Sequence, residues 1–236
     1  MGSPVTTGRR RRPSPPRLRQ ALSLVLPLAL LWPGPALPSA ARAGELPQVV
    51  DVPSRPAFSR PPWAAEAPAE VGQRLMYRTV LRTEKPGRLQ VQMSDGRSFR
   101  LGGDAVLRLL PNSLELQQGQ IIAWIQPGRP RGLPLQVRTR VATASINGTT
   151  VFVEASDTAV KLFGWEGRVQ VRTDDGRKVE LRAGEQISWE NGSWQPKRRL
   201  TLPELQQRRG RSILLNGFSA AMDTLPVLER ELGLSP

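Results

Sequence analysis

The sequence predicts an all-β fold, an antiparallel sandwich or roll of short strands, followed by a short helical tail. Three observations predict this class. A strand–turn–strand passage at residues 87–101 returns without a gap at residues 167–181, so a β-hairpin is duplicated. Short apolar segments alternate with turn pairs such as Asp95-Gly96 throughout the middle of the chain. Helical periodicity is confined to residues 196–236.

The first residues have the pattern of a secretory signal peptide. Arginines occupy a start without acidic residues, an apolar stretch covers residues 21–32, and Ala41-Arg42-Ala43 resembles a cleavage site before Gly44. The apolar stretch is shorter than the ~20 residues that span a bilayer. We therefore expect cleavage and a periplasmic or secreted protein, with an uncleaved membrane anchor as the alternative.

The composition excludes several classes of function. The chain has no Cys and no His, which removes thiol chemistry, histidine triads and Cys/His metal sites. Seven of the 34 Lys and Arg, and none of the 20 Asp and Glu, precede residue 44, so cleavage lowers the formal net charge from +14 to +7. This balance favours anionic polymers or lipid headgroups as partners. Nucleic acid is not expected, because the basic residues do not cluster with aromatic ones.

Four segments are expected: a signal peptide at residues 1–43, a Pro-rich linker at 44–70, a β-domain at 71–195 and a helical extension at 196–236. The linker contains six prolines and is predicted to be extended and poorly packed, with Trp63 as its one candidate anchor. Within the β-domain, strands are predicted at residues 73–81, 87–93, 97–101, 105–110, 113–117, 120–125, 135–139, 141–146, 150–154, 158–163, 168–173, 177–181 and 186–189.

The duplicated hairpin restricts its own register. A two-residue loop would pair an apolar side chain with a polar one, because cross-strand partners share a face. A three-residue loop instead places Val91 opposite Phe99 and, in the second copy, Val171 opposite Val179. The last loop residue, a glycine in both copies, should then adopt a left-handed conformation. The other face of each hairpin is polar and is expected to contact water.

This polar face supplies the candidate binding surface, with Arg100 from the first copy, Arg172 from the second, and Trp194 beside the Asn191-Gly192 turn. Tryptophans on a sheet can bind sugar rings, although packing in the core is their commoner role. The β-domain contains four of them, Trp124, Trp165, Trp189 and Trp194.

No catalytic residue, cofactor or metal ion is expected. Asp174-Asp175 and Asp157 lack the spacing of a calcium loop, and aspartates in tight turns have a local backbone role. A glycosidase needs two converging carboxyl groups, and nothing in the spacing brings together the four candidates, Glu154, Glu166, Glu180 and Glu185.

The C-terminal residues change to a helical pattern. Residues 201–204 have the sequence Thr-Leu-Pro-Glu, a capping box with proline near the first helical position. One amphipathic helix should follow it, and a second should cover residues 219–232, either as one helix or broken at Pro226. Docking on the β-domain, peripheral contact with a membrane and binding of a partner are the alternatives for these helices. Because the last predicted strand ends before Pro196, we expect that the tail can be removed without unfolding the β-domain.

A series of short motifs runs in order through residues 72–192. The motifs are Gly72 with Thr79 and Thr83, Leu-Gln-Val at 89–91, Ser-Asp-Gly-Arg-Ser-Phe-Arg-Leu at 94–101, Ser-Leu-Glu-Leu at 113–116, Gln-Gly-Gln at 118–120, Val-Arg-Thr at 137–139, Val-Ala-Thr at 141–143, Asn-Gly-Thr at 147–149, Glu-Gly-Arg-Val at 166–169 and Leu-Arg-Ala-Gly-Glu at 181–185. No single motif is specific. In this order and spacing they resemble the FecR-domain family of exported β-rich domains.

The resemblance implies an all-β domain with a sensing or interaction role. The aromatic residue of the Gly-Thr strand, Phe152, comes one place late, so Val151 is expected at the buried position. Better-known family members regulate sigma factors through a cytoplasmic domain, and the short basic start cannot form one. The expected function is therefore a non-enzymatic exported sensor or interaction module whose partner is an envelope protein. The alternative is a structural binder of anionic envelope polysaccharide.

Overall fold

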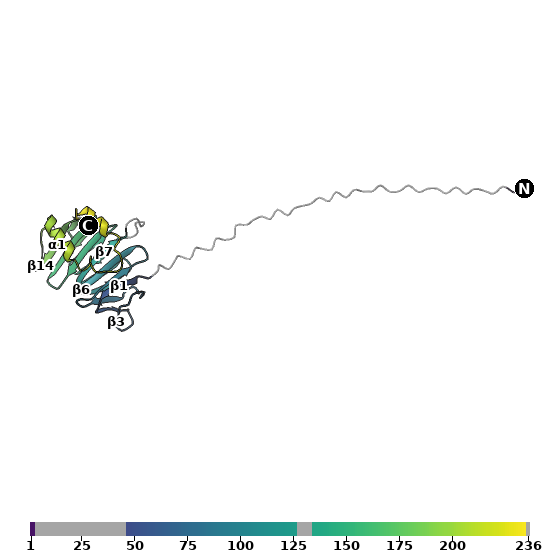
Figure 1. Ribbon diagram of the computed structural model, residues 1–236, viewed down its shortest axis with the longest axis horizontal. Coiled ribbons are helices and arrows are strands. Elements are labelled where there is room, and N and C mark those ends of the chain that lie inside the picture. The colour runs from purple at the N-terminus through teal and green to yellow at the C-terminus, as the bar shows by residue number, and fades with distance from the viewer. Residues whose placement is uncertain (3–45, 127–133, 235–236) are drawn as a thin grey trace. The chain divides into compact units, whose positions relative to one another are not determined.

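The computed structural model describes residues 1–2, 46–126 and 134–234 (Figure 1). Residues 3–43 of the expected signal peptide lie outside the described residues. The elements are β1 (Gln48–Ser54), β2 (Ala57–Arg60), β3 (Ala67–Pro68), β4 (Val80–Thr83), β5 (Arg88–Gln92), β6 (Arg97–Leu109), β7 (Ser113–Ile125), β8 (Leu135–Arg138), β9 (Ala142–Ile146), β10 (Thr150–Ala155), β11 (Ala159–Glu166), β12 (Arg168–Thr173), β13 (Lys178–Arg182), β14 (Glu185–Glu190), β15 (Ser193–Trp194), β16 (Arg198–Arg199), α1 (Leu202–Arg211) and α2 (Leu225–Glu231). The prediction of an all-β fold with a short helical tail is confirmed.

The register predicted for the duplicated hairpin is also confirmed. Val91 on β5 pairs with Phe99 on β6, and Val171 on β12 pairs with Val179 on β13. The loop glycines that end the two turns have φ angles of 85° and 86°. A conformation of this kind is open to glycine at little cost, which explains why both copies carry one.

The described strands form one sheet, with the order β13-β12-β9-β8-β7-β10-β11-β14-β15 along its main path, while β6 joins β7 to β4 and β5. Most pairs are antiparallel, and β7 with β8 is parallel. A register shift interrupts the β6–β7 pairing after Gly102. Opposite the bulge, Gly119 has a φ of 90°, and a Cβ there would lie 2.3 Å from the Ala105 Cα. Only glycine permits so close an approach of the two strands.

Side chains that point to the inner face of the sheet form a single core. It combines residues from strands that are distant in the sheet order, such as Val91 on β5 and Val171 on β12. The sheet must therefore fold back on itself as a roll. Val151 is buried in this core, as predicted, whereas the neighbouring Phe152 belongs to a second cluster on the outer face, because side chains alternate along a strand.

The prediction that residues 44–70 are poorly packed is wrong for the part that the structure describes. β1 pairs with β5 and β2 pairs with β4. Val49 and Ala57 are buried in the inner core. The prolines are compatible with this arrangement because β1 pairs along one side only among the described strands, and proline is tolerated in edge strands.

The C-terminal tail docks on the outer face of the sheet (Figure 1). Its apolar side chains form a second core with those of β7, β10 and β11. The buried members are Ile122, Trp124, Phe152, Phe163, Trp165, Ala183, Leu200, Leu205, Leu214, Leu215, Met222, Leu228, Leu232 and Leu234. Docking is thus the alternative that the structure adopts. Leu205 of α1 and Leu228 of α2 are buried in this second core, whereas Leu202 of α1 is exposed, and peripheral membrane contact through these helices stays a prediction. No helix within the described residues is long and apolar enough to cross a membrane.

The two helices differ in extent from their prediction. α1 begins at the expected capping box, in which the Thr201 backbone N–H donates to the Glu204 carboxylate over 2.7 Å. α2 is much shorter than expected, because Pro226 occupies its first turn and the preceding residues run as an irregular segment over the sheet. Proline lacks the N–H that a longer helix would need at this position.

Candidate binding surface

Arg100 does not lie on a wet face, contrary to the prediction. It is 2% exposed and belongs to a cross-strand row in which Gln90 and Ile122 are its neighbours. Its guanidinium donates to the backbone oxygens of Leu214, over 2.9 Å, and Ala220, over 2.8 Å. Arg100 is therefore a tail anchor, and this role depends on residues more than a hundred positions later in the chain.

Asp51 and Arg88 complete this anchor. The Asp51 carboxylate accepts the backbone N–H groups of Ser219, over 2.5 Å, and Ala220, over 2.9 Å. Arg88 donates to the backbone oxygens of Ile213 and Asn216. Burial lowers the pKa of Arg100 to about 10, with Asp51 opposing and Arg88 adding to the effect. Charged side chains of β1, β5 and β6 thus satisfy backbone groups of the tail that no helix or strand pairs.

The other two predicted surface residues lie elsewhere. Arg172 is exposed on the outer face of the second hairpin, which the tail leaves open. Trp194 is half-buried on β15, and its Nε1–H donates to Asp174 over 3.2 Å. Trp194 packs against the inner core and pairs with Trp189. The structure therefore does not bring Arg100 into one surface with Arg172 and Trp194.

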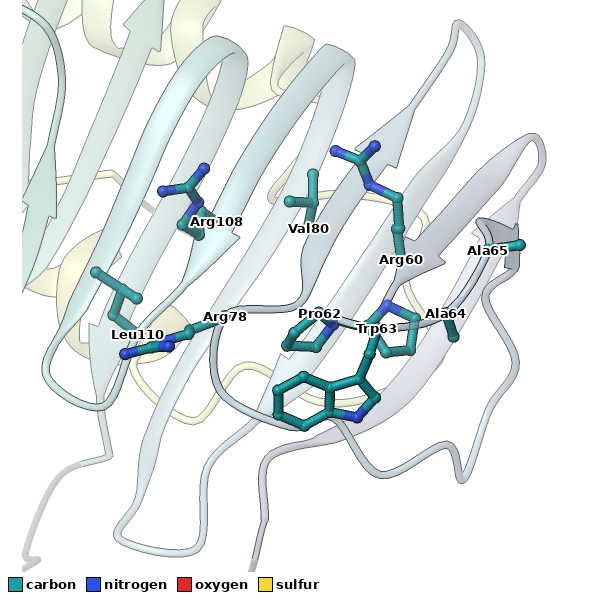
Figure 2. A pocket seen from close by; sticks show the side chains of 10 residues that line it. Arg60, Pro62, Trp63, Ala64, Ala65, Arg78, Val80, Arg108 and Leu110 are labelled. Atoms are coloured by element: carbon teal, nitrogen blue, oxygen red, sulfur yellow. The ribbon is translucent and has the colours of Figure 1, made fainter.

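A basic hollow that the sequence did not reveal lies at β2, β4 and β6 (Figure 2). We call it the arginine hollow. Its volume is about 540 Å³, and its lining residues are Arg60, Pro61, Pro62, Trp63, Ala64, Ala65, Arg78, Val80, Arg108 and Leu110. The lining contains three arginines and no acidic residue.

Strand register builds the arginine hollow. Arg60 on β2 pairs with Val80 on β4, and Val80 pairs with Arg108 on β6. Directly opposed residues share a face, so the two arginines flank Val80. Arg78 is held beside them by its backbone N–H, which donates to the Leu109 oxygen over 2.6 Å. Trp63 is 78% exposed, and Figure 2 shows its ring at the edge of the group.

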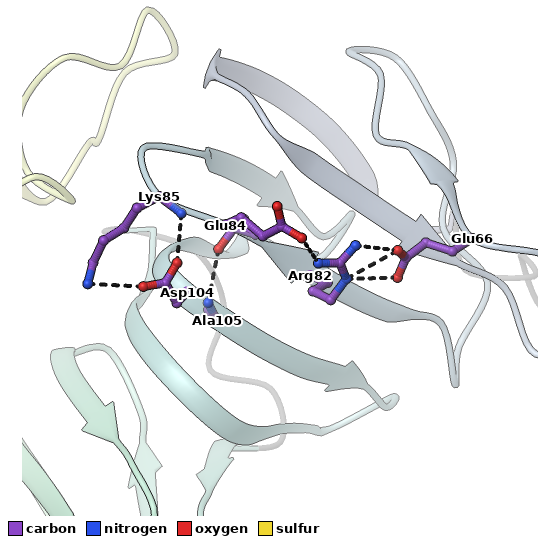
Figure 3. A network of polar contacts seen from close by, with 7 residues as sticks. Glu66, Arg82, Glu84, Lys85, Asp104 and Ala105 are labelled. Atoms are coloured by element: carbon purple, nitrogen blue, oxygen red, sulfur yellow. Dashed lines mark hydrogen bonds and ion pairs between the residues drawn. The ribbon is translucent and has the colours of Figure 1, made fainter.

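Next to the arginine hollow, the carboxylates of Glu66 and Glu84 belong to a polar network (Figure 3). Arg82 binds Glu66 on one side and Glu84 on the other, and its guanidinium lies 4.4 Å from the centre of the Phe58 ring. The Arg82 hydrogen bond lowers the pKa of Glu66 below its usual range. The charge of Arg60 also contributes to this lowering, although Glu66 is not among the residues that line the arginine hollow. Arg108 has a distant ion pair, 3.9 Å from Glu115.

Further contacts fix the strands beneath this region. Asp104 accepts the backbone N–H of Lys85 over 2.7 Å and pairs with its ammonium group over 3.0 Å. The Ala105 N–H donates to the Thr83 hydroxyl over 3.2 Å (Figure 3). These bonds connect β4 to β6 across the bulge, and they therefore hold in place the two strands that carry Val80 and Arg108 of the arginine hollow.

The remaining predicted candidates have structural roles. Trp124 and Trp165 are buried under the tail, so neither offers a face to a sugar. Asp175 accepts the backbone N–H of Arg177 over 3.3 Å, the local turn role that was predicted, and hydrogen bonds from Arg177 and Thr173 lower the pKa of Asp175 to about 2.

The four candidate carboxylates contact different groups. Gln120 donates to Glu154, Gln170 to Glu180 and Lys197 to Glu185. Glu166 accepts a hydrogen bond from the Thr150 hydroxyl over 2.8 Å. Burial raises the pKa of Glu166, and the charge of Glu231 adds to this increase while the bond from Thr150 opposes it.

The structure is thus an all-β domain that has a basic hollow on its surface and a C-terminal tail packed on the outer face of its sheet. Residues 79–170 match the family model described as FecR protein. The chain therefore contains a FecR domain, as the resemblance predicted. The comparison with curated proteins finds no match.

Two solved structures are similar to part of the chain, both of a candidate anti-sigma factor from Parabacteroides distasonis. The one at 1.65 Å resolution has 24% identity and a TM-score of 0.42, and covers 48% of this chain and 55% of that chain. The one at 2.50 Å has 22% identity and a TM-score of 0.45, and covers 51% and 59%. The chain thus spans less than three fifths of the length of these structures.

Proposed function

We propose that this protein is a non-enzymatic, exported FecR-domain module that works at the cell envelope by binding, and that the arginine hollow is its contact surface. One observation carries the proposal. Arg60, Arg78 and Arg108, from three parts of the fold, line one hollow with an exposed Trp63 at its edge, and the lining holds no carboxylate. Arginine suits such a surface because its planar group binds carboxylates through two parallel hydrogen bonds.

The partner that fits the arginine hollow best is an acidic segment of an envelope protein. Binding of such a segment would be consistent with a role in sensing or protein interaction. The second candidate is an anionic envelope polysaccharide. Trp63 favours it specifically, since an exposed ring beside cationic groups can stack on a sugar while arginines bind its acidic groups. The absence of Cys and His from the sequence supports binding over catalysis, because these residues supply the usual nucleophiles and general bases near neutral pH.

The test uses two acidic probes, poly-glutamate and polygalacturonate, with neutral dextran as the reference. Binding of each to the full chain is measured by calorimetry. We expect the triple variant R60Q/R78Q/R108Q to bind the preferred acidic probe at least about tenfold more weakly, as the loss of charge-assisted hydrogen bonds requires. The matched control R168Q/R199Q/R230Q removes the same charge from exposed sites elsewhere.

The probes separate the two candidates. A protein partner predicts tighter binding of poly-glutamate and a small effect of Trp63→Ala. A polysaccharide partner predicts tighter binding of polygalacturonate and a large effect of the same substitution. If the triple variant and its control lose equal affinity, net charge alone explains the binding, and the arginine hollow is not the contact surface.

A further inference from the structure

A cleft separates α1 from the outer face of the sheet. We call it the tail cleft. Its volume is about 490 Å³, within the range of small-molecule sites, and the lining comes from β7, β10, β11, β14, β16 and the tail. The lining residues include Phe152 and Trp165 from the sheet, and Arg208 and Arg211 from α1. The site is separate from the arginine hollow, and no residue lines both.

Arg208 is the central group of the tail cleft. Its guanidinium carbon lies 4.8 Å from the ring centre of Phe152, 4.3 Å from that of Phe163 and 5.9 Å from that of Trp165. Its hydrogen bond within the described residues is a long one, 3.4 Å to the Gln186 amide oxygen. The rings hold the planar cation in place, and most of its donor groups are left for another partner.

The charges of the cleft do not balance. Glu204 pairs with Arg198 over 2.9 Å, and Glu154 pairs with Lys161 over 3.9 Å. These are the acidic residues that line the cleft, so Arg208 and Arg211 have no carboxylate partner among the described residues. Burial lowers the pKa of Arg208 to about 10, the charge of Glu154 opposes this effect, and the charge of Arg198 adds to it.

A second, independent signal comes from Trp165. The residue is 1% exposed, and its Nε1–H has no hydrogen-bond partner within the described part of the chain. A buried donor of this kind normally has an acceptor, and leaving it without one is unfavourable. The indole belongs to the same lining as Arg208. One acceptor group bound in the cleft would serve both.

We propose that the tail cleft binds a small organic carboxylate with a planar apolar body. The carboxylate would accept hydrogen bonds from Arg208 and the Trp165 indole, and the apolar body would lie against the Phe152 ring. Such a ligand would contact the sheet and α1 together, so binding would also stabilise the docked tail.

The test titrates 2-naphthoate into the full chain, with 2-naphthamide as its uncharged counterpart. Proton–nitrogen NMR spectra locate the probe through the Trp165 indole signal, and calorimetry gives its affinity. We expect 2-naphthoate to shift the Trp165 signal and to bind at least about tenfold more tightly than the amide. Arg208→Gln should reduce the affinity at least about tenfold, and Trp165→Phe by a smaller factor, because it removes one neutral hydrogen bond.

Arg230→Gln is the matched control, since Arg230 is exposed on α2 and lies outside the cleft lining. Far-UV circular dichroism verifies that each variant folds, and Trp165→Phe remains informative should Arg208→Gln not fold. Absence of binding, equal affinity for the amide, or an equal loss in Arg230→Gln would each overturn the proposal.

Discussion

The guanidinium carbon of Arg100 on β6 lies 4.2 Å from the centre of the Phe218 ring in the C-terminal tail. The contact places a cation from the middle of the chain under a loop from its end. It also explains the burial of Arg100, because the same guanidinium donates to two backbone oxygens of that loop. Arg100 thus binds the tail and does not face solvent.

Arg100→Met should therefore destabilise the protein. The substitution keeps the apolar stem but leaves the Leu214 and Ala220 oxygens without a donor, at a cost of about 1–3 kcal/mol for each buried acceptor. Arg172→Met changes the same residue type at an exposed position and should alter the free energy of unfolding by less than about 0.5 kcal/mol. Urea unfolding followed by fluorescence measures both. Equal values would mean that the Arg100 contacts do not stabilise the fold.

Removal of residues 200–236 should abolish folding of the β-domain or cause it to aggregate, in contrast to the expectation from the strand pattern. The deletion exposes Trp124, Phe163 and Trp165, and each such side chain loses about 1.5–3 kcal/mol of burial free energy. The sum is comparable with the whole stability of an ordinary domain, about 5–15 kcal/mol. Circular dichroism and size-exclusion chromatography report the outcome. If the fragment were soluble, monomeric and cooperatively unfolding, the β-domain would not need the tail on its outer face in order to fold.

The hairpin glycines give a prediction about backbone conformation. Gly176 has a φ of 86°, and its Cβ position is unobstructed, so only the backbone opposes a side chain there. Gly176→Val should cost about 1–3 kcal/mol. Gly96 has the same backbone conformation but is buried, so Gly96→Val should cost at least as much. Gly210→Ala supplies the control, since that glycine lies in α1 with open space around it. This substitution should stabilise the protein by about 0.5–1 kcal/mol. A neutral effect at both hairpins would contradict the three-residue loops.

Glu166 makes stability depend on pH. Because its folded-state pKa is raised, the folded protein binds this proton more tightly than the unfolded chain does. Its stabilising contribution is complete below the ordinary pKa of 4.5 and is lost as the pH rises through the folded-state value. Glu166→Gln should raise the melting temperature at about pH 8 and leave it unchanged at about pH 4. Glu190→Gln, at an exposed site, should show no such difference between the two pH values. A melting-temperature increase for Glu166→Gln that is independent of pH would exclude this mechanism.

Export gives a prediction outside the described residues. The Ala41-Arg42-Ala43 sequence should direct cleavage before Gly44. Expression of the full chain in a bacterial host, fractionation and N-terminal sequencing of the periplasmic protein provide the measurement. Recovery of a membrane-bound form that retains its first thirty or so residues would favour the uncleaved anchor.

The sequence determined local features better than distant ones. The hairpin register was predictable because loop length and side-chain alternation leave one solution within 15 residues, from residue 87 to residue 101. The burial of Arg100 under the tail was not predictable, since no residue near β6 indicates that residues 213–221 pack on this strand. Phe152 gave a partial signal, because an aromatic residue on the face opposite Val151 requires a second packing layer.

The arginine hollow was missed for another reason. Arg60 follows three prolines of the predicted linker. Only the pairing of β2 with β4, and of β4 with β6, places it on the same face as Arg108. Trp63 was the one usable signal, as an aromatic residue in a Pro-rich segment. Its exposure and its position at the rim of the hollow depend on tertiary structure that local composition does not encode.

The duplicated hairpins retain a glutamine but not the charge opposite it. Gln90 accepts a hydrogen bond from Arg100 over 2.8 Å, whereas Gln170 donates one to Glu180 over 3.0 Å. A side-chain amide can hydrogen-bond to a cation or to an anion, since it carries both an acceptor and donors. The glutamine was therefore free to persist while its partner diverged. The two copies are no longer exchangeable. If the second hairpin stood in the first position, it would set a carboxylate against the Leu214 and Ala220 oxygens, and the tail would lose its anchor.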